Sequence, residues 1–88
     1  MEVFFTKSFY REIGKVRDKK LAAKIEEVII KVKNAKQFSE IENLKKLTGF
    51  KNAYRIRIGD YRIGILYEKN AVTFSVFGNR KDIYKFFP

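Results

Sequence analysis

The chain has 88 residues, of which 45% are hydrophobic and 16% aromatic, so residues 1–88 can form one globular domain with its own core. It carries 20 Lys and Arg against 10 Asp and Glu, a net charge of +10, and has neither Cys nor His. These absences exclude disulfides, thiolate nucleophiles, the commonest zinc ligands and the usual acid–base group at neutral pH. Catalysis would have to use Lys, Arg, Tyr or carboxylates, and we expect neither a metal nor a cofactor.

The positive charge is concentrated in the second half of the chain. Residues 1–43 carry ten basic and seven acidic side chains, whereas residues 44–88 carry ten basic and three acidic ones. This asymmetry favours a face that binds nucleic acid, and no segment has the basic, apolar helix expected of a membrane-surface protein. The N-terminus lacks a signal-peptide pattern and no apolar run approaches 18 residues, so we expect a soluble cytoplasmic protein.

The first half of the chain predicts one strand and two helices. Residues 2–5 (EVFF) read as a short strand, and Thr6 and Asp18 are candidate N-caps for the two helices. The first helix has apolar residues at helical spacing, namely Phe9, Ile13 and Val16. The second ends near residue 34 and has a longer apolar stripe, formed by Leu21, Ile25, Val28, Ile29 and Val32. The helices are expected to pack as a hairpin on one face of a sheet.

The second half predicts a meander of strands. Residues 35–52 connect it to the helices and include a possible edge strand at 44–47; the main strands are expected at 53–58, 61–68 and 71–78. Residues 79–88 close the chain as a short helical turn or tail. The order β-α-α-β-β-β predicts the α+β class, with a two-helix hairpin packed on one face of a small, mainly antiparallel sheet.

The hairpin YRIRIGDYRIGILY, residues 54–67, places three arginines on one face. Gly59 suits the first position of a two-residue type II′ turn, so Arg57 faces Arg62 and Arg55 faces Gly64, while the isoleucines and tyrosines share the other face. Like charges directly opposite each other destabilise a sheet. The arrangement therefore favours a binding face over a merely solvated one.

Direct continuation of this register predicts how the last strand lies against the hairpin. Gly64 would face Ser75 and Arg62 would face Phe77. Arg80 would then lie at the end of the cross-strand row of residues that contains Arg62. Small residues beside arginines would leave a hollow. We interpret that hollow as a cradle for an anion.

The segment KKLTGFKNAYRIRIGDYRIGILYEKNAVTFSVFGNRKDIYKFF resembles the C-terminal half of the RelE/ParE toxin superfamily of prokaryotic toxin–antitoxin modules. The helical first half fits the same order of elements, so the resemblance implies a RelE-like fold for the whole chain. It also implies a ribosome-dependent, metal-independent mRNA endonuclease that acts in the ribosomal A site and inhibits translation. The family's functional positions match five residues, which become the candidate catalytic set: Arg55, Arg57, Arg62, Arg80 and Tyr84.

These residue types suit RNA cleavage by the ribose 2′-hydroxyl. Arginine forks can hold phosphate oxygens, and an aromatic ring can stack on a splayed base. Many relatives have a lysine on the first hairpin strand and a histidine where this chain has Asn79. Because arginine is not deprotonated at neutral pH, the general base is left open between Tyr84, Lys45, Lys46 and Lys51. Candidate nucleic-acid-binding residues are Lys45, Lys46, Lys51, Phe77 and Lys81.

Two other functions fit the same fold. One is a ParE-like inhibitor of DNA gyrase without nuclease activity, and the other is an inactive relative that binds only antitoxin or RNA, because fold alone does not decide function. Tyr84 can also be read as a core filler, and Lys45 and Lys46 as a solvated pair. The expected partners are an acidic, partly disordered antitoxin, the ribosome and mRNA.

Overall fold

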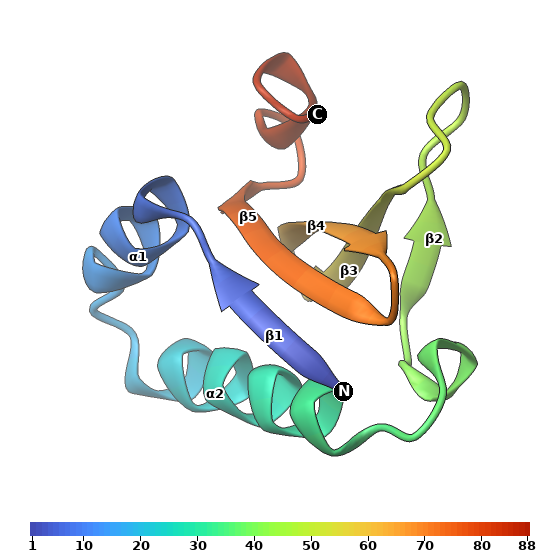
Figure 1. Cartoon of the computed structure of the whole chain (residues 1–88). Helices are drawn as coiled ribbons and strands as arrows, with labels where there is room; N and C mark the ends of the chain where they lie inside the picture. The colour runs from blue at the N-terminus through green and yellow to red at the C-terminus, as the bar shows by residue number, and fades with distance from the viewer.

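The secondary structure follows the predicted order of elements. A computed structural model describes all 88 residues and has the α+β fold class predicted for the chain (Figure 1). A short turn, η1, is the one element that the sequence did not predict. The elements are β1 (Glu2–Phe5), α1 (Lys7–Gly14), α2 (Lys19–Asn34), η1 (Phe38–Glu40), β2 (Leu44–Lys46), β3 (Ala53–Ile58), β4 (Tyr61–Glu68), β5 (Ala71–Asn79) and η2 (Ile83–Lys85).

Both helices begin at the predicted caps. The Thr6 hydroxyl accepts a hydrogen bond from the backbone N–H of Phe9 at 3.0 Å, and the Asp18 carboxylate accepts from Lys20 and Leu21 at 2.9 and 3.2 Å. These bonds satisfy N–H groups that the first turn of a helix leaves without partners. No helix of the structure has both the length and the apolar character needed to cross a membrane.

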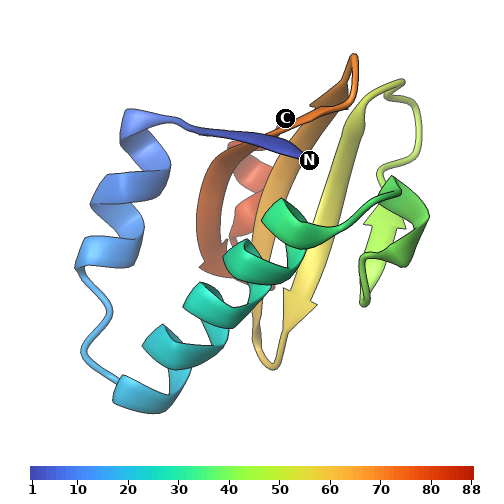
Figure 2. The same cartoon turned by 60° about the horizontal axis from the view of Figure 1, so that its bottom comes forward.

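The five strands form one mixed sheet in the order β1-β5-β4-β3-β2. The first strand is parallel to β5, and the other pairs are antiparallel. The connection from β1 carries both helices over one face of the sheet, as Figures 1 and 2 show. The first and last strands thereby become neighbours, and the last strand lies inside the sheet between β1 and β4.

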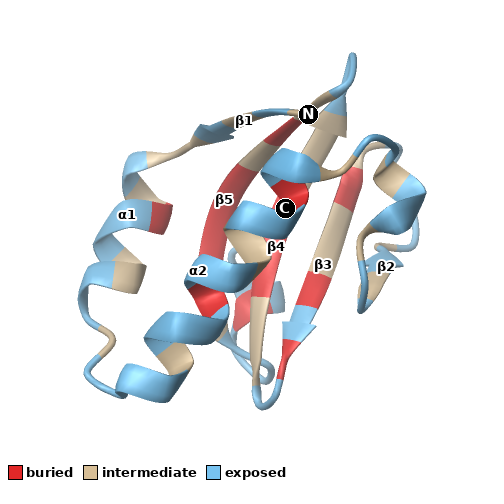
Figure 3. Ribbon diagram, turned by 90° about the horizontal axis from the view of Figure 1, so that it is seen from below, coloured by how far each residue is buried: buried red, intermediate tan, exposed pale blue.

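The main core lies between the helices and the sheet. Helix α2 crosses the strands and buries Ile25 and Val32, while the sheet contributes Ile56, Ile63 and Ile65 (Figure 3). The predicted hairpin register is confirmed, with Arg57 opposite Arg62 and Arg55 opposite Gly64. Because side chains alternate along a strand, burial of the isoleucines places these arginines on the opposite face.

The predicted pairing between β4 and β5 is wrong beyond Ile65. Ile65 pairs with Phe74 and Gly64 with Val76, so Ser75 has no partner on β4. This is a β-bulge, in which an extra residue on one strand reverses the alternation of side chains beyond it. Arg62 consequently faces Gly78, and Phe77 pairs with Ile63 on the helix side of the sheet.

A second, smaller core lies on the face that carries the arginines. It consists of four buried residues, Ala53, Val76, Ile83 and Phe87. Figure 1 shows the C-terminal turn on the side of the sheet away from both helices. The predicted hollow at Gly64 is therefore filled, because the ring of Phe87 lies directly over this glycine.

We predict that Thr6→Ala destabilises the fold by about 1–3 kcal/mol, because the hydroxyl has two partners. Besides capping α1, it donates to the carbonyl oxygen of Ser75 in the bulge at 2.6 Å. Urea unfolding monitored by circular dichroism measures the loss. Thr6→Ser should retain most of the stability, and Thr48→Ala, at an exposed threonine, serves as the control. A loss equal to that of Thr48→Ala would refute the role of the hydroxyl.

Candidate nucleic-acid interface

A basic groove lies between β2 and the C-terminal segment, on the sheet face opposite the helices. Its volume is about 590 Å³. Six of its nine lining residues are cationic and none is acidic. The lining residues are Lys45, Lys46, Leu47, Thr48, Arg55, Arg62, Arg80, Lys81 and Tyr84. The groove thus collects most of the residues that the sequence predicted for the site.

Two arginines from neighbouring strands form the floor of the basic groove. Arg55 Nη1 donates to the carbonyl oxygen of Asn43 at 3.0 Å. Arg62 Nη1 donates to the carbonyl oxygens of Gly59 and Tyr61 at 2.8 and 2.9 Å. Since a guanidinium has five N–H donors, these bonds orient each group and leave further donors for a ligand.

The walls of the basic groove come from the edge strand and the C-terminal segment. Lys45 of β2 lies directly opposite Arg55. On the other side, the backbone N–H of Arg80 donates to the carbonyl oxygen of Asp60 at 2.9 Å, which ties the segment to the β3–β4 turn. Tyr84 is 50% exposed, so its ring is accessible from the groove rather than part of the core.

No carboxylate neutralises the basic groove. The three ion pairs of the protein join Lys15 to Glu12, Lys31 to Glu27, and Lys85 to Asp82, and none includes a cation of the groove. Acidic side chains form no cluster of three or more that could hold a metal ion. A concave surface lined by one sign of charge raises the local concentration of ligands of the opposite sign. The groove is therefore suited to a phosphate-bearing ligand.

Three of the predicted site residues lie outside the basic groove. Arg57 lies on the same sheet face as Arg62 but does not line the basic groove. Lys51 lies further along the β2–β3 loop. Phe77 is buried and stacks on Tyr61 at a centroid distance of 5.3 Å. The prediction that Phe77 stacks on a base is therefore wrong, because the bulge turns it toward the helices. Thr48, which no sequence pattern marked, does line the groove.

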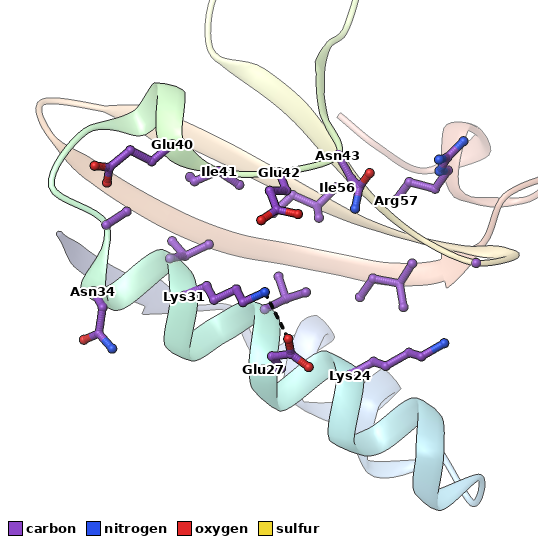
Figure 4. A pocket seen from close by; sticks show the side chains of 15 residues that line it. Lys24, Glu27, Lys31, Asn34, Glu40, Ile41, Glu42, Asn43, Ile56 and Arg57 are labelled. Atoms are coloured by element: carbon purple, nitrogen blue, oxygen red, sulfur yellow. Dashed lines mark ion pairs between the residues drawn. The ribbon is translucent and has the colours of Figure 1, made fainter.

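A second cleft of about 500 Å³ separates α2 from β3 and the residues before β2 (Figure 4). Its lining includes apolar residues such as Val28 and Ile56, and its charged residues are of both signs. The Glu27 carboxylate, 3.0 Å from Lys31 Nζ, raises the pKa of this lysine through a hydrogen bond and its charge. Arg57 borders the cleft with its side chain extending away from α2. The mixed charge makes this cleft a poor site for a polyanion.

Comparison with known proteins places the chain in a family. No protein-family model matches it. Over an alignment of 89 positions, covering 100% of both chains, it is 34% identical to Toxin RelE3 of Methanocaldococcus jannaschii. The chain belongs to the RelE toxin family. This confirms the family membership that the hairpin and the sequence after it predicted.

Solved structures of RelE-family members share the fold. The toxin of the RelB–RelE antitoxin–toxin complex from Methanococcus jannaschii is 31% identical and superposes with a TM-score of 0.80, over 97% of this chain and 99% of that one. The RelE–RelB complex from Pyrococcus horikoshii gives a TM-score of 0.70 at 19% identity, covering 90% and 93%. The E. coli RelBE complex gives 0.69 at 17% identity, covering 89% and 94%. The last two show the likeness of the fold alone.

We predict that the two opposed arginines of this RelE-family chain differ in their effect on stability. Arg57 makes no side-chain hydrogen bond, so Arg57→Gln should leave stability unchanged or raise it by up to about 0.5 kcal/mol through relief of repulsion. Arg62→Gln should lower it by about 0.5–1.5 kcal/mol, because two hydrogen bonds to carbonyl oxygens are lost.

Urea unfolding of both variants at low and high salt measures this difference. The gain from Arg57→Gln should shrink at high salt, because screening weakens the repulsion that the substitution removes. Equal destabilisation by the two substitutions would show that Arg57 has a structural role not explained by its contacts.

Proposed function

We propose that this RelE-family chain is the toxin of a toxin–antitoxin system and acts as a ribosome-dependent, metal-independent mRNA endonuclease. The observation that carries the proposal is the basic groove, where Arg55, Arg62 and Arg80 lie beside an accessible Tyr84 without any acidic residue. A site that only had to be solvated would not gather like charges at a cost to stability.

The proposed chemistry is attack of a ribose 2′-hydroxyl on the adjacent phosphorus. The 2′-hydroxyl gives its proton to a general base as the new O–P bond closes a 2′,3′-cyclic phosphate. The bond to the 5′ oxygen breaks, and this oxygen takes a proton from water or from a protonated side chain of the groove. Negative charge grows on the phosphate oxygens in the transition state, and preorganised cations stabilise it. The guanidinium groups of Arg55, Arg62 and Arg80 supply the positive charge that stabilises these oxygens, so a metal ion is not required for this role.

Proton transfer is assigned to the residues of the basic groove that can accept a proton. Of the four candidates from the sequence, Tyr84, Lys45 and Lys46 line the groove, while Lys51 does not. A general base must come within hydrogen-bond reach of the proton that it removes. We therefore keep the first three as candidates and place Lys51 outside the site. The exposed ring of Tyr84 is also positioned to stack on a base.

We predict that the purified protein cleaves a defined mRNA on ribosomes that hold an empty A site. Mapping the new 5′ ends by primer extension should locate the cuts in the A-site codon. Arg55→Gln, Arg62→Gln and Arg80→Gln should each lower kcat/KM about 10-fold or more. Arg11→Gln is the matched control, because this arginine is exposed on α1, away from the groove.

Intact mRNA in the presence of the wild-type protein would contradict the nuclease proposal. Inhibition of supercoiling by DNA gyrase under the same conditions would then identify a ParE-like function. Loss of binding to both targets, with antitoxin binding kept, would identify an inactive relative. Thermal melting of each variant distinguishes loss of the site from loss of the fold.

The proposed partner is an acidic antitoxin. Related toxins have been solved in complexes with RelB, and a +10 chain with an unpaired basic groove suits an acidic, partly disordered segment that orders on contact. Carboxylates of this segment would occupy the positions of RNA phosphates in the basic groove. Antitoxin and ribosome should therefore compete for the toxin.

We predict that the acidic protein encoded beside this gene displaces the toxin from ribosomes. Sedimentation of ribosomes at increasing antitoxin concentration measures the displacement. Arg80→Gln should weaken antitoxin binding, and Arg11→Gln should not. Undiminished ribosome binding by the antitoxin-bound toxin would show that inhibition is not competitive.

A further inference from the structure

The ring of Phe87 occupies the space that Gly64 leaves in the middle of β4. A Cβ atom at residue 64 would lie 2.6 Å from Phe87 Cδ2 and 2.8 Å from Phe87 Cε2. Unbonded carbon atoms prefer separations of about 3.5–4.0 Å, so a side chain and this ring cannot share the space. The ring is only 6% exposed although it belongs to the penultimate residue of the chain. Glycine at this position is what lets the C-terminal ring reach the sheet.

Apolar burial is what holds the C-terminal turn against the sheet beyond residue 80. Arg80 makes the last backbone hydrogen bond to the rest of the fold, to the carbonyl oxygen of Asp60. The later backbone hydrogen bonds stay within residues 79–86. Ile83, which is fully buried, and Phe87 are the two residues of the segment that enter the second core. They determine where the turn lies.

Tyr84 is located between these two buried residues in the sequence and borders the basic groove. The side chain of Ile83 is buried, whereas that of Tyr84, the next residue, is half exposed. The half-exposed ring of Phe86 also reaches the sheet, where its Cζ atom would lie 3.4 Å from a Cβ at Gly78. Phe87 adds a buried contact four residues after Ile83, and this second buried contact restricts rotation of the turn about Ile83.

We propose that Phe87 is a positioning residue: seated against Gly64, it holds Tyr84 over the floor of the basic groove. The proposal rests on the proposed function, in which Tyr84 acts on the RNA. Phe87 itself does not line the groove, so its effect on cleavage is exerted through the turn. Loss of the Phe87 ring should therefore lower kcat more than it weakens the binding of RNA, because the arginines on the floor of the groove still bind RNA.

Hydrogen exchange tests the anchor without any need for activity. In Phe87→Ala, amides of residues 82–88 should exchange at least about 10-fold faster, while those of β3, β4 and β5 stay protected. Phe86→Ala is the matched control, because this neighbouring ring is 54% exposed and stays outside the second core. Phe87→Leu should restore part of the protection. Unchanged exchange rates in Phe87→Ala, or equally faster exchange in Phe86→Ala, would overturn the proposal that Phe87 holds the turn in place.

Cleavage kinetics test the positioning. Phe87→Ala should lower kcat about 10-fold or more, toward the value of Tyr84→Ala, with KM within about twofold of wild type. Phe86→Ala should keep the wild-type kcat. The double variant Tyr84→Ala with Phe87→Ala should be no slower than Tyr84→Ala alone, because the two residues act through one group.

The two proposals fail in different ways. Full kcat in Phe87→Ala, or a rise in KM alone, would overturn the positioning while leaving the nuclease intact. Absence of cleavage by the wild type would overturn the proposed function. In that case the exchange experiment still decides whether Phe87 fixes the turn that carries Tyr84, because its readout does not depend on catalysis.

Discussion

The bulge at Ser75 is the constraint on which the arrangement of the groove depends. It lets Phe74 and Phe77, three residues apart, both face the helices, and it turns Val76 toward the opposite face beside Gly64. The Thr6 hydroxyl links this irregularity to the start of α1 by donating to the Ser75 carbonyl oxygen and accepting from the backbone N–H of Phe9. One side chain thus connects the helical layer, the parallel strand pair and the strand that leads to the candidate site.

The sheet buries residues on both faces, and this explains how the groove is built. Isoleucines and aromatic residues cover the helix side, while a four-residue core on the other side is completed by the C-terminal turn. The part of this second face between the turn and β2 is left open, and there the basic residues gather. The groove is therefore bounded by the same apolar contacts that stabilise the end of the chain.

The basic groove illustrates how function can oppose stability. Lys45 faces Arg55 within the groove, and Arg62, which also lines it, faces Arg57 just outside it, so two like-charged pairs lie side by side. Each such pair costs a few tenths of a kcal/mol, and bonds to backbone carbonyl oxygens keep two of the guanidinium groups in place. The ligand that neutralises the groove should relieve this repulsion, which couples binding of a polyanion to stability of the fold.

The sequence alone determined the fold class, the helix caps, the Gly59 turn and the face on which the arginines lie, because these follow from local chemistry and from alternation along each strand. Its resemblance to RelE toxins also selected the residues that the groove later brought together. Only the tertiary structure decided the partner of Arg62 and the burial of Phe77. One extra residue in β5 reverses the alternation of its side chains, and no residue type in this strand indicates where such a bulge occurs. The tertiary structure also decided that Phe87 fills the space at Gly64, since a contact between residues 23 positions apart leaves no periodic signal in the sequence.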